Sequence, residues 1–335
     1  MIFNLPELPI HKQYKGTITP EDIILLKLGQ NKSINDAELK ILHECIEFYK
    51  SCFAALEKIN LSELNSTTEA ELKKYLDNVF PIAYLTCRYM SFKYIFRVSI
   101  IQNDFLESGK VRDIKFLTFP SKELIKQKGI YNRANTPNST VLYASFKQSV
   151  AIMETKPKSG DRIIITLWQN ESNKDFNSYV IPNIDKINNK DLLENALAFK
   201  NRKQDLHPLE FEILDTILSF ISKQFVKEVN CQSKQRFEYL FSAFFTEQIL
   251  RHEPFPNLEF IDCIKYPSVA CNHTGENLAI HPESVKKLKI VKAVEMKITS
   301  INYDNTFDWE NNPINYDILR KSSQIIDNII IWNDD

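Results

Sequence analysis

Three polar side chains in the stretch "YNRANTPNSTVLYASFKQSVAIMETKP", residues 131–157, could do chemistry together: Arg133, Tyr143 and Glu154. An arginine can hold a phosphate through two parallel hydrogen bonds, and an aromatic ring offers a flat face for stacking. A carboxylate can stabilise positive charge that develops during a reaction. Each residue also has an ordinary interpretation, namely a surface hairpin residue, a half-buried strand residue and a solvated residue near a helix end. Their nearly equal spacing does not decide between these interpretations.

Missing motifs exclude several other kinds of site. The sequence has no GxGxxG, GxxxxGK[ST], HExxH or GxSxG, and its six glycines leave little material for a glycine-built phosphate loop. His273 and His281 lie near Cys271 without an evident fourth ligand, so no metal site is predicted. A cysteine–histidine hydrolase stays open, although the pattern selects no particular cysteine.

Composition narrows the class of protein. The chain has 335 residues, of which 43% are hydrophobic and 25% charged, as in ordinary globular proteins. A formal net charge of -1 argues against direct binding to nucleic acid or to an anionic membrane. We see no signal peptide, no apolar run of about 18 residues and no CxxC pair among the six cysteines, so a cytoplasmic location is expected.

The N-terminal part, residues 1–90, is predicted to be a small helical unit. Its helix signals are "TITPEDIILLKLGQ" with Thr19 as cap and Pro20 first, "SINDAELKILHECIEFYKSCFAALEKIN" with an Asn35–Glu38 capping box, and "STTEAELKKYLDNVF" with a Ser66–Glu69 capping box. The third helix should end before Pro81. Cys45 and Cys52 are two turns apart on the second helix, which favours two core thiols.

Strands and helices then mix without a strict alternation, which predicts an α+β protein. The predicted strands are "KYIFRVSII", "TVLYAS", "DRIIITLW", "NLEFIDCIKYPSVA", "ENLAIH" and "LKIVKAVEMKITSIN". The predicted helices are "FKQSVAIMETKP", capped by Ser145 or a neighbour, "PLEFEILDTILSFISKQFVKEV", "KQRFEYLFSAFFTEQILRH" and a closing amphipathic helix "NYDILRKSSQIIDNIIIW". The polar residues 170–206 are interpreted as an excursion that carries a short helix and contributes nothing to the core.

Four blocks in this order resemble the RES domain family. They are "IFRVS" with Arg97; the central block Arg133-x-Asn135-x-Pro137, Leu142-Tyr143-Ala144-Ser145 and Ala151-x-x-Glu154; the helix "RFEYLFSAFFTEQIL", where the family has a tyrosine; and "CIKYPSV" with "GENLAIHP", which carry Ser268 and Asn277. Together they cover about residues 91–290. The sequence departs from the family at Cys263, where a glycine is usual, and lacks glycines near the Arg133–Pro137 turn.

The resemblance implies an ADP-ribosyltransferase-like split β-sheet core that binds NAD and breaks its nicotinamide–ribose bond. Family members are typically toxins of bacterial toxin–antitoxin systems that consume NAD by hydrolysis or phosphorolysis. A partner with a helix-turn-helix (Xre-type) domain holds them in check. NAD is then the substrate, inorganic phosphate is a co-substrate in the second reaction, and no prosthetic group is expected. A homo-oligomer stays open.

The residue roles follow from that resemblance. Nicotinamide leaves as a neutral molecule, so one carboxylate should suffice where glycosidases normally need two. Glu154, Arg97 and Tyr143 are the expected catalytic residues: the carboxylate would stabilise an oxocarbenium-like ribose, and the ring would stack on nicotinamide. Arg97 is also telling by itself, because a buried arginine in an apolar strand must be paired with something anionic. The expected binding residues are Arg97, Arg133, Tyr143, Ser268 and Asn277.

We therefore expect a helical extension over residues 1–90 and a RES-like NAD-binding catalytic domain over 91–335, with a polar and helical insertion around 170–230. Two alternatives stay open. The same site could transfer ADP-ribose to a macromolecule, or the chain could be a non-catalytic interaction protein on a RES-like scaffold. The retained arginines, tyrosine and glutamate argue against the second alternative.

Overall fold

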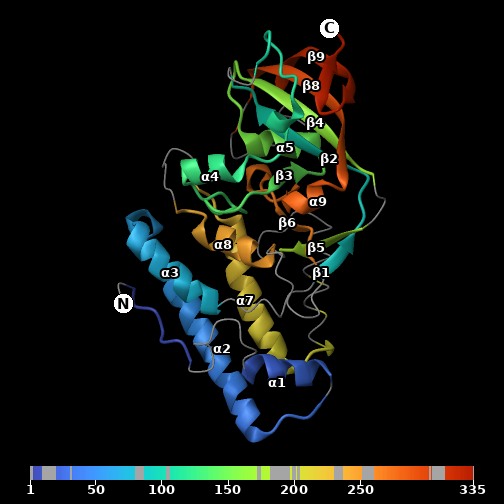
Figure 1. The fold of residues 1–335 in the computed structure, drawn as a ribbon. Helices are drawn as coiled ribbons and strands as arrows, with labels where there is room; N and C mark the ends of the chain where they lie inside the picture. Colours follow the sequence, from blue (N-terminus) through green and yellow to red (C-terminus); the bar gives the residue numbers. More distant parts are fainter. Residues whose placement is uncertain are drawn as a thin grey trace.

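The protein has helices at one end and strands at the other, with both packed on shared apolar cores (Figure 1). Among the described helices, none is long and apolar enough to cross a membrane. The computed structural model describes residues 3–9, 20–30, 32–79, 87–102, 106–171, 175–181, 204–229, 237–250, 260–301 and 314–334, together with 197, 201 and 303.

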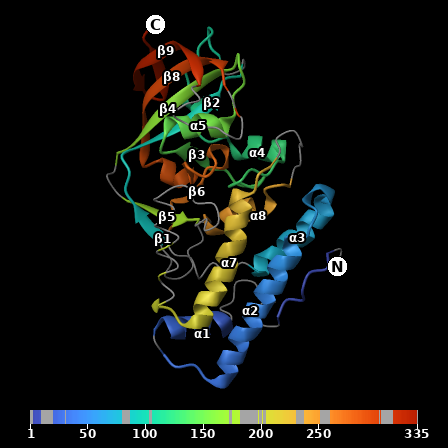
Figure 2. The ribbon, with the colours of Figure 1, turned by 180° about the vertical axis from the view of Figure 1, so that it is seen from behind.

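Five helices make up most of the helical end, and α2, α3 and α7 among them run side by side in Figures 1 and 2. They are α1 (Pro20–Gly29), α2 (Asp36–Leu56), α3 (Ser66–Val79), α7 (Pro208–Val226) and α8 (Leu240–Ile249), with the short 3₁₀ turn η2 (Leu61–Glu63) between α2 and α3. Helix α2 packs along α7, where the rings of Phe53 and Phe220 stack with centroids 4.5 Å apart. Cys45 and Cys52 are both fully buried on α2, as predicted.

The helix ends confirm one predicted cap and correct another. Asn35 and Glu38 form the predicted capping box at α2. At α3 the cap is Asn65, whose side chain accepts from the backbone N–H groups of Thr67 and Thr68, so the predicted cap at Ser66 was wrong by one residue. Glu69 accepts a hydrogen bond from the hydroxyl of Tyr131. Helix α3 ends at Val79, before Pro81, and the predicted Thr19 cap lies outside the described residues.

Ten described strands form one mixed sheet in the order β1-β5-β6-β7-β3-β2-β4-β8-β9-β10. Strands β5 and β6 are parallel, and the other neighbouring pairs are antiparallel. The bounds are β1 Cys87–Met90, β2 Tyr94–Ile100, β3 Leu142–Ser145, β4 Arg162–Asn170, β5 Phe176–Val180, β6 Cys263–Pro267, β7 Glu276–Ile280, β8 Leu288–Ser300, β9 Asn315–Ile326 and β10 Ile329–Trp332. This mixed α+β architecture is the predicted fold class.

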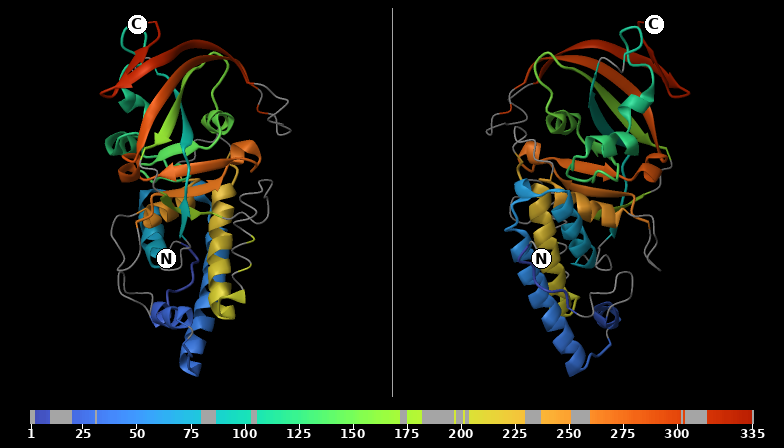
Figure 3. Two further views of the ribbon diagram at one scale, coloured as in Figure 1. Left: turned by 90° about the vertical axis from the view of Figure 1, so that its right-hand side faces the viewer. Right: turned by 60° about the vertical axis from the view of Figure 1, so that its left-hand side comes forward.

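The sheet is nearly divided between β2 and β3. Those strands are paired at one position only, Phe96 with Ser145, whereas β2 and β4 are paired over seven positions. Strands β2, β4, β8 and β9 therefore form one group, and β3, β7, β6 and β5 form another, which lies across the end of α7 (Figure 3). Short helices fill the connections: η5 (Ile114–Leu117), α4 (Lys122–Lys128), α5 (Gln148–Thr155), η7 (Val269–Cys271) and α9 (Pro282–Val285).

Two predictions about secondary structure were wrong. Residues 176–180 form β5 inside the sheet, with Phe176 and Tyr179 buried, although the segment was interpreted as lying outside the core. Asn177 is hydrogen-bonded to the residues just before β6: its side chain donates to the carbonyl of Phe260, and its backbone N–H donates to the side chain of Asp262. The short helix predicted within 170–206 falls mostly on residues that are not described.

The closing helix predicted over residues 315–332 is instead the hairpin β9–β10. Asp327 and Asn328 form its two-residue turn, both with positive φ (48° and 66°), the geometry that joins twisted strands. The hairpin packs on the loop before η5: the indole of Trp332 donates to the carbonyl of Val111 at 2.9 Å, and the backbone N–H of Ile114 donates to the carbonyl of Asn328.

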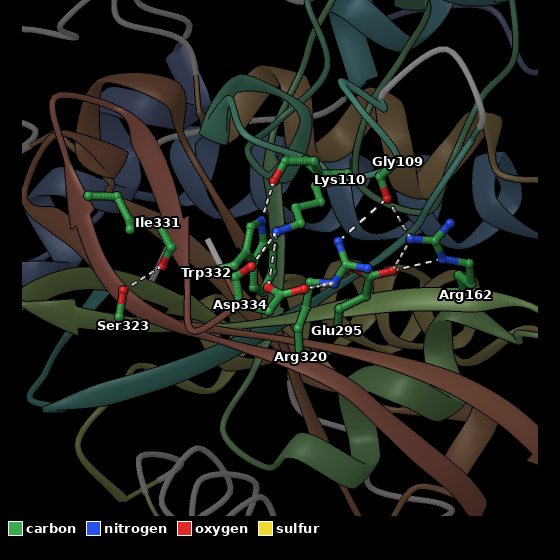
Figure 4. Close-up of polar contacts among 10 residues, drawn as sticks. Gly109, Lys110, Arg162, Glu295, Arg320, Ser323, Ile331, Trp332 and Asp334 are labelled. Atoms are coloured by element: carbon green, nitrogen blue, oxygen red, sulfur yellow. Dashed lines mark hydrogen bonds and ion pairs between the residues drawn. The ribbon is translucent and has the colours of Figure 1, made fainter.

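A charged network fastens the same hairpin (Figure 4). The carboxylate of Glu295 on β8 is fully buried between Arg162 on β4, whose Nε donates at 2.7 Å, and Arg320 on β9, at 3.3 Å. Lys110 pairs with Asp334 at 3.2 Å. Because a buried carboxylate is stable only when it is paired, these contacts fix β9 against β8 and hold the C-terminal residues beside the loop.

The helical end and the sheet share an apolar core. One cluster of buried residues runs from α1, α2 and α3 through α7 and α8 to one face of β6 and β7, where Ile264, Tyr266 and Ala279 belong to it. The opposite face of the sheet packs into a second apolar cluster, which includes Leu142, Leu278 and Trp332. A domain boundary near residue 90 stays a prediction of the sequence.

Candidate active site

A row of polar side chains crosses one face of the sheet where the two strand groups diverge. The register pairs Tyr266 with Asn277 and Asn277 with Ser145, and side chains that are directly opposite on neighbouring antiparallel strands share a face. Tyr143 precedes Ser145 by two residues and therefore projects from the same face. Alternation along three strands thus gathers Tyr143, Ser145, Asn277 and Tyr266.

Glu154 reaches this row from α5. Helix α5 buries Ala151 and Ile152 against β2 and β4, while Val150 and Met153 pack on Cys271. Helical spacing then leaves Glu154 on the side of β7 and η7. Its Oε1 accepts a hydrogen bond from the Ser268 hydroxyl at 2.6 Å and a second from the Asn277 amide at 2.7 Å. No hydrogen bond between described residues uses its other oxygen, Oε2.

The two donors to Glu154 are themselves fixed. Ser268 is fully buried and Asn277 is 4% exposed. The Ser145 hydroxyl donates to Asn277 Oδ1 at 2.7 Å, which leaves the Nδ2 group of the same amide directed at Glu154. The backbone N–H of Ser268 donates to the carbonyl of Gly275 at 2.8 Å, so the loop that carries Ser268 is tied to the start of β7. The carboxylate is therefore held in one orientation with one oxygen left over.

The thiol of Cys271 lies beside this arrangement without the character of a nucleophile. Burial raises the pKa of Cys271 to about 12. A hydrogen bond with Ser268 lowers this pKa, and the nearby Glu154 carboxylate raises it. A thiolate is the reactive form of cysteine, so this thiol is inert at neutral pH. Among the described residues, no group of three or more His, Cys, Asp or Glu side chains could hold a metal ion.

Tyr143 is locked through its hydroxyl. The hydroxyl donates to the side chain of Asn135 at 2.8 Å and accepts from the backbone N–H of Ala134 at 3.0 Å. Burial raises the pKa of Tyr143 well above its ordinary value, although the charges of Arg133 and Arg97 oppose that shift. The ring is thus neutral and fixed in position, with part of its surface exposed.

Arg133 lies at the C-terminal end of α7. Its guanidinium donates to the backbone carbonyls of Phe225 and Lys227 and to the hydroxyl of Tyr239, over whose ring it sits with 4.7 Å between Cζ and the centroid. A cation there satisfies carbonyls that the helix leaves without partners and interacts favourably with the helix dipole. Arg133 therefore joins the 131–143 segment to the helical end, as Tyr131 does through Glu69.

Arg97 occupies the gap between the two strand groups. Its Nη1 donates to the carbonyl of Tyr143 and its Nε to the carbonyl of Leu117, both at 3.0 Å. Because Phe96 shares the face of Ser145, Arg97 projects toward the opposite face, where η5 lies. Burial lowers the pKa of Arg97 to about 10, so the side chain stays charged at neutral pH. The expected anionic partner was wrong: among the described residues, the hydrogen bonds of Arg97 go to two backbone carbonyls.

The structure brings the predicted residues together in two connected groups. Glu154, Ser268 and Asn277 are joined directly, and Arg97, Tyr143 and the turn that carries Arg133 form the second group. Their roles toward a substrate stay predictions. Sequence reasoning missed Ser145, which was expected to cap α5 although the cap position is Lys147 with no side-chain bond. It also missed Tyr266, whose signal was its place two residues before Ser268 in an alternating strand.

Comparison with known proteins identifies the family of the part of the chain that carries most of these residues. A family model described as the RES domain matches residues 123–304, more than half of the chain. Arg133, Tyr143, Glu154, Ser268 and Asn277 lie inside the matched range, whereas Arg97 precedes it. No curated protein and no solved structure matches the chain, so the ADP-ribosyltransferase-like description of the fold stays a prediction.

Proposed function

Because the chain belongs to the RES domain family, we propose that it is an enzyme that breaks the nicotinamide–ribose bond of NAD. The observation that carries the proposal is the orientation of Glu154, whose Oε1 accepts from both Ser268 and Asn277 while Oε2 has no hydrogen bond to a described residue. A carboxylate held in this way can stabilise a cationic transition state without reorganising during the reaction.

The proposed cleavage of the nicotinamide–ribose bond requires one carboxylate from the protein. The C–N bond between ribose and nicotinamide breaks, and its electron pair stays on the nicotinamide nitrogen, which neutralises the pyridinium. The ribose carbon becomes oxocarbenium-like and is captured by an oxygen of water or of inorganic phosphate, which loses a proton to solvent. Glu154 stabilises the cationic carbon through Oε2, and no general acid is needed because the leaving group departs neutral.

The other residues bind and orient the dinucleotide in this proposal. Tyr143 is fixed by Asn135 and Ala134 and offers its ring to nicotinamide. Arg133 supplies positive charge for the pyrophosphate, although its hydrogen bonds in this structure go to protein groups. Substrate binding therefore uses its remaining donors or exchanges some of these contacts. Arg97 projects toward the opposite face of the sheet and donates to the carbonyl of Tyr143, so in this proposal it positions Tyr143 and does not contact the substrate.

Purified protein incubated with NAD tests the proposal through the release of nicotinamide. Comparing the products in phosphate buffer and in phosphate-free buffer identifies the acceptor: ADP-ribose in both indicates water, whereas a phosphorylated ADP-ribose in the first indicates phosphorolysis. Labelled ADP-ribose that appears on a macromolecule, with little released free, would favour transfer instead. Intact NAD after long incubation with folded protein would overturn the proposal.

We further propose that the activity is toxic to the cell that makes it and is neutralised by a helix-turn-helix antitoxin, as the family implies. Expression with and without the neighbouring gene tests this role in a growth assay. Harmless expression of protein that consumes NAD would contradict it.

A further inference from the structure

A tyrosine between the two groups of site residues has a hydroxyl that no described residue hydrogen-bonds. Tyr266 on β6 is 3% exposed, and its ring packs against Phe225 with centroids 5.3 Å apart. No hydrogen bond from a described residue reaches its hydroxyl. The hydroxyl is not one of the fully buried side-chain atoms that lack a hydrogen bond, so it is accessible to a ligand although the ring is buried. A tyrosine with a buried ring and an accessible hydroxyl can pack in the core and still bind a polar group.

The position of Tyr266 relates it to both groups. It is directly opposite Asn277, the residue that donates to Glu154, and its ring contacts Phe225, whose carbonyl accepts from Arg133. Its electrostatic neighbours are Tyr143, Glu154, Arg133 and Tyr239. The side chain thus lies between the carboxylate assigned to the ribose and the arginine assigned to the pyrophosphate.

The hydroxyl can act only as a neutral hydrogen-bonding group. Burial raises the pKa of Tyr266 well above its ordinary value, and the neighbouring Tyr143 and Glu154 act in the same direction. The proton is therefore retained at neutral pH, and the group is suited to donate to an oxygen that arrives with a ligand.

We infer that the Tyr266 hydroxyl donates a hydrogen bond to an oxygen of the pyrophosphate part of the substrate, between Glu154 and Arg133. The inference rests on the proposed function and adds a substrate-binding residue to it. Since that part of NAD is unchanged during C–N cleavage, the bond is equally strong in the ground state and the transition state. Such a contact lowers KM and leaves kcat unaffected.

The test compares Tyr266→Phe with Tyr75→Phe by thermal unfolding and by the kinetics of nicotinamide release. Tyr75 is a matched control on α3, 8% exposed, whose hydroxyl donates to the carbonyl of Pro6 at 2.9 Å. Tyr266→Phe should keep or raise the melting temperature, because it removes a hydroxyl to which no described residue hydrogen-bonds, and should raise KM roughly tenfold at unchanged kcat. Tyr75→Phe should show the opposite pattern, a lower melting temperature with unchanged KM.

The outcomes separate this inference from the function on which it rests. A wild-type KM for Tyr266→Phe, with normal nicotinamide release by the wild-type protein, would overturn the inference alone. A melting temperature that falls as far as that of Tyr75→Phe would also overturn it, because the hydroxyl would then have a partner within the protein. Failure of the wild-type protein to release nicotinamide would overturn the proposed function and the inference with it.

Discussion

The amide of Asn277 donates to Oε1 of Glu154 at 2.7 Å, from a strand that begins more than 100 residues after the glutamate. The contact joins β7 to α5 and determines how the carboxylate faces the site. Its consequences can be measured at each residue that maintains it.

Asn277→Ala should lower kcat for nicotinamide release about tenfold. The substitution removes one of the two hydrogen bonds that orient Glu154, and the loss of such a bond is worth about 1.5 kcal/mol when one partner is charged. Steady-state kinetics with NAD measure the effect. Asn138→Ala is the matched control, because Asn138 is exposed in the turn after Arg133, and it should have wild-type kcat. Equal rates for both variants would show that Asn277 does not position the carboxylate.

Ser145→Ala should lower kcat by a smaller factor, and only through Asn277. The Ser145 hydroxyl donates to Asn277 Oδ1, so its removal lets the amide turn without deleting the donor to Glu154. A double-mutant cycle distinguishes this role from a direct one. The variant with both Ser145→Ala and Asn277→Ala should be no slower than Asn277→Ala alone. If the double variant were slower by the product of the two single effects on kcat, Ser145 would act independently of Asn277.

Arg133→Lys should destabilise the protein by about 1.5–3 kcal/mol, because lysine cannot reproduce the fork that binds two carbonyls and the Tyr239 hydroxyl. Denaturant unfolding gives the free energy. The control is Lys223→Ala on the same helix, α7, which removes an exposed ion pair with Glu57 at the end of α2. It should change the free energy of unfolding by less than about 1 kcal/mol. If the two variants were equally stable, the end of α7 would not depend on the guanidinium.

Gly275→Ala should destabilise the loop that carries Ser268 and the helix that carries Glu154. A Cβ at position 275 would lie 2.6 Å from Cγ2 of Val150 on α5, and overpacking of this kind costs about 1–3 kcal/mol. The clash is with one side chain, so Val150→Ala should relieve it. The double variant should be more stable than the sum of the single effects predicts, and simple additivity would place the strain elsewhere.

Much of the local structure could be predicted from the sequence because it follows from local signals. Alternation predicted β2, β3 and β4, and the Asn35–Glu38 pair predicted the start of α2. The C-terminal hairpin was missed because the spacing of its isoleucines also fits a helix. The turn that breaks the pattern, Asp327-Asn328, lacks the glycine that usually marks such turns. Strand β5 was missed because its neighbours, rather than its polar composition, place it in the sheet.

Most residues of the candidate site could be predicted from the sequence, but the contacts between them could not. No spacing rule relates Glu154 to Ser268 and Asn277, and only the resemblance to a family connected them. Arg97 shows the limit of single-residue reasoning: the sequence indicated an arginine paired with an anionic group, whereas the structure pairs it with the carbonyls of Leu117 and Tyr143. Ser145 and Tyr266 could be recognised only from the strand register that places them opposite Asn277.

The most direct test of the account is the rate of nicotinamide release from NAD by the wild-type protein and by Glu154→Gln. Glutamine can still accept the bonds from Ser268 and Asn277 but carries no charge, so the fold and melting temperature should be retained. The account predicts a fall in kcat of about 100-fold or more, comparable to the loss of one oxyanion-hole donor. A Glu154→Gln variant that releases nicotinamide at the wild-type rate would contradict it.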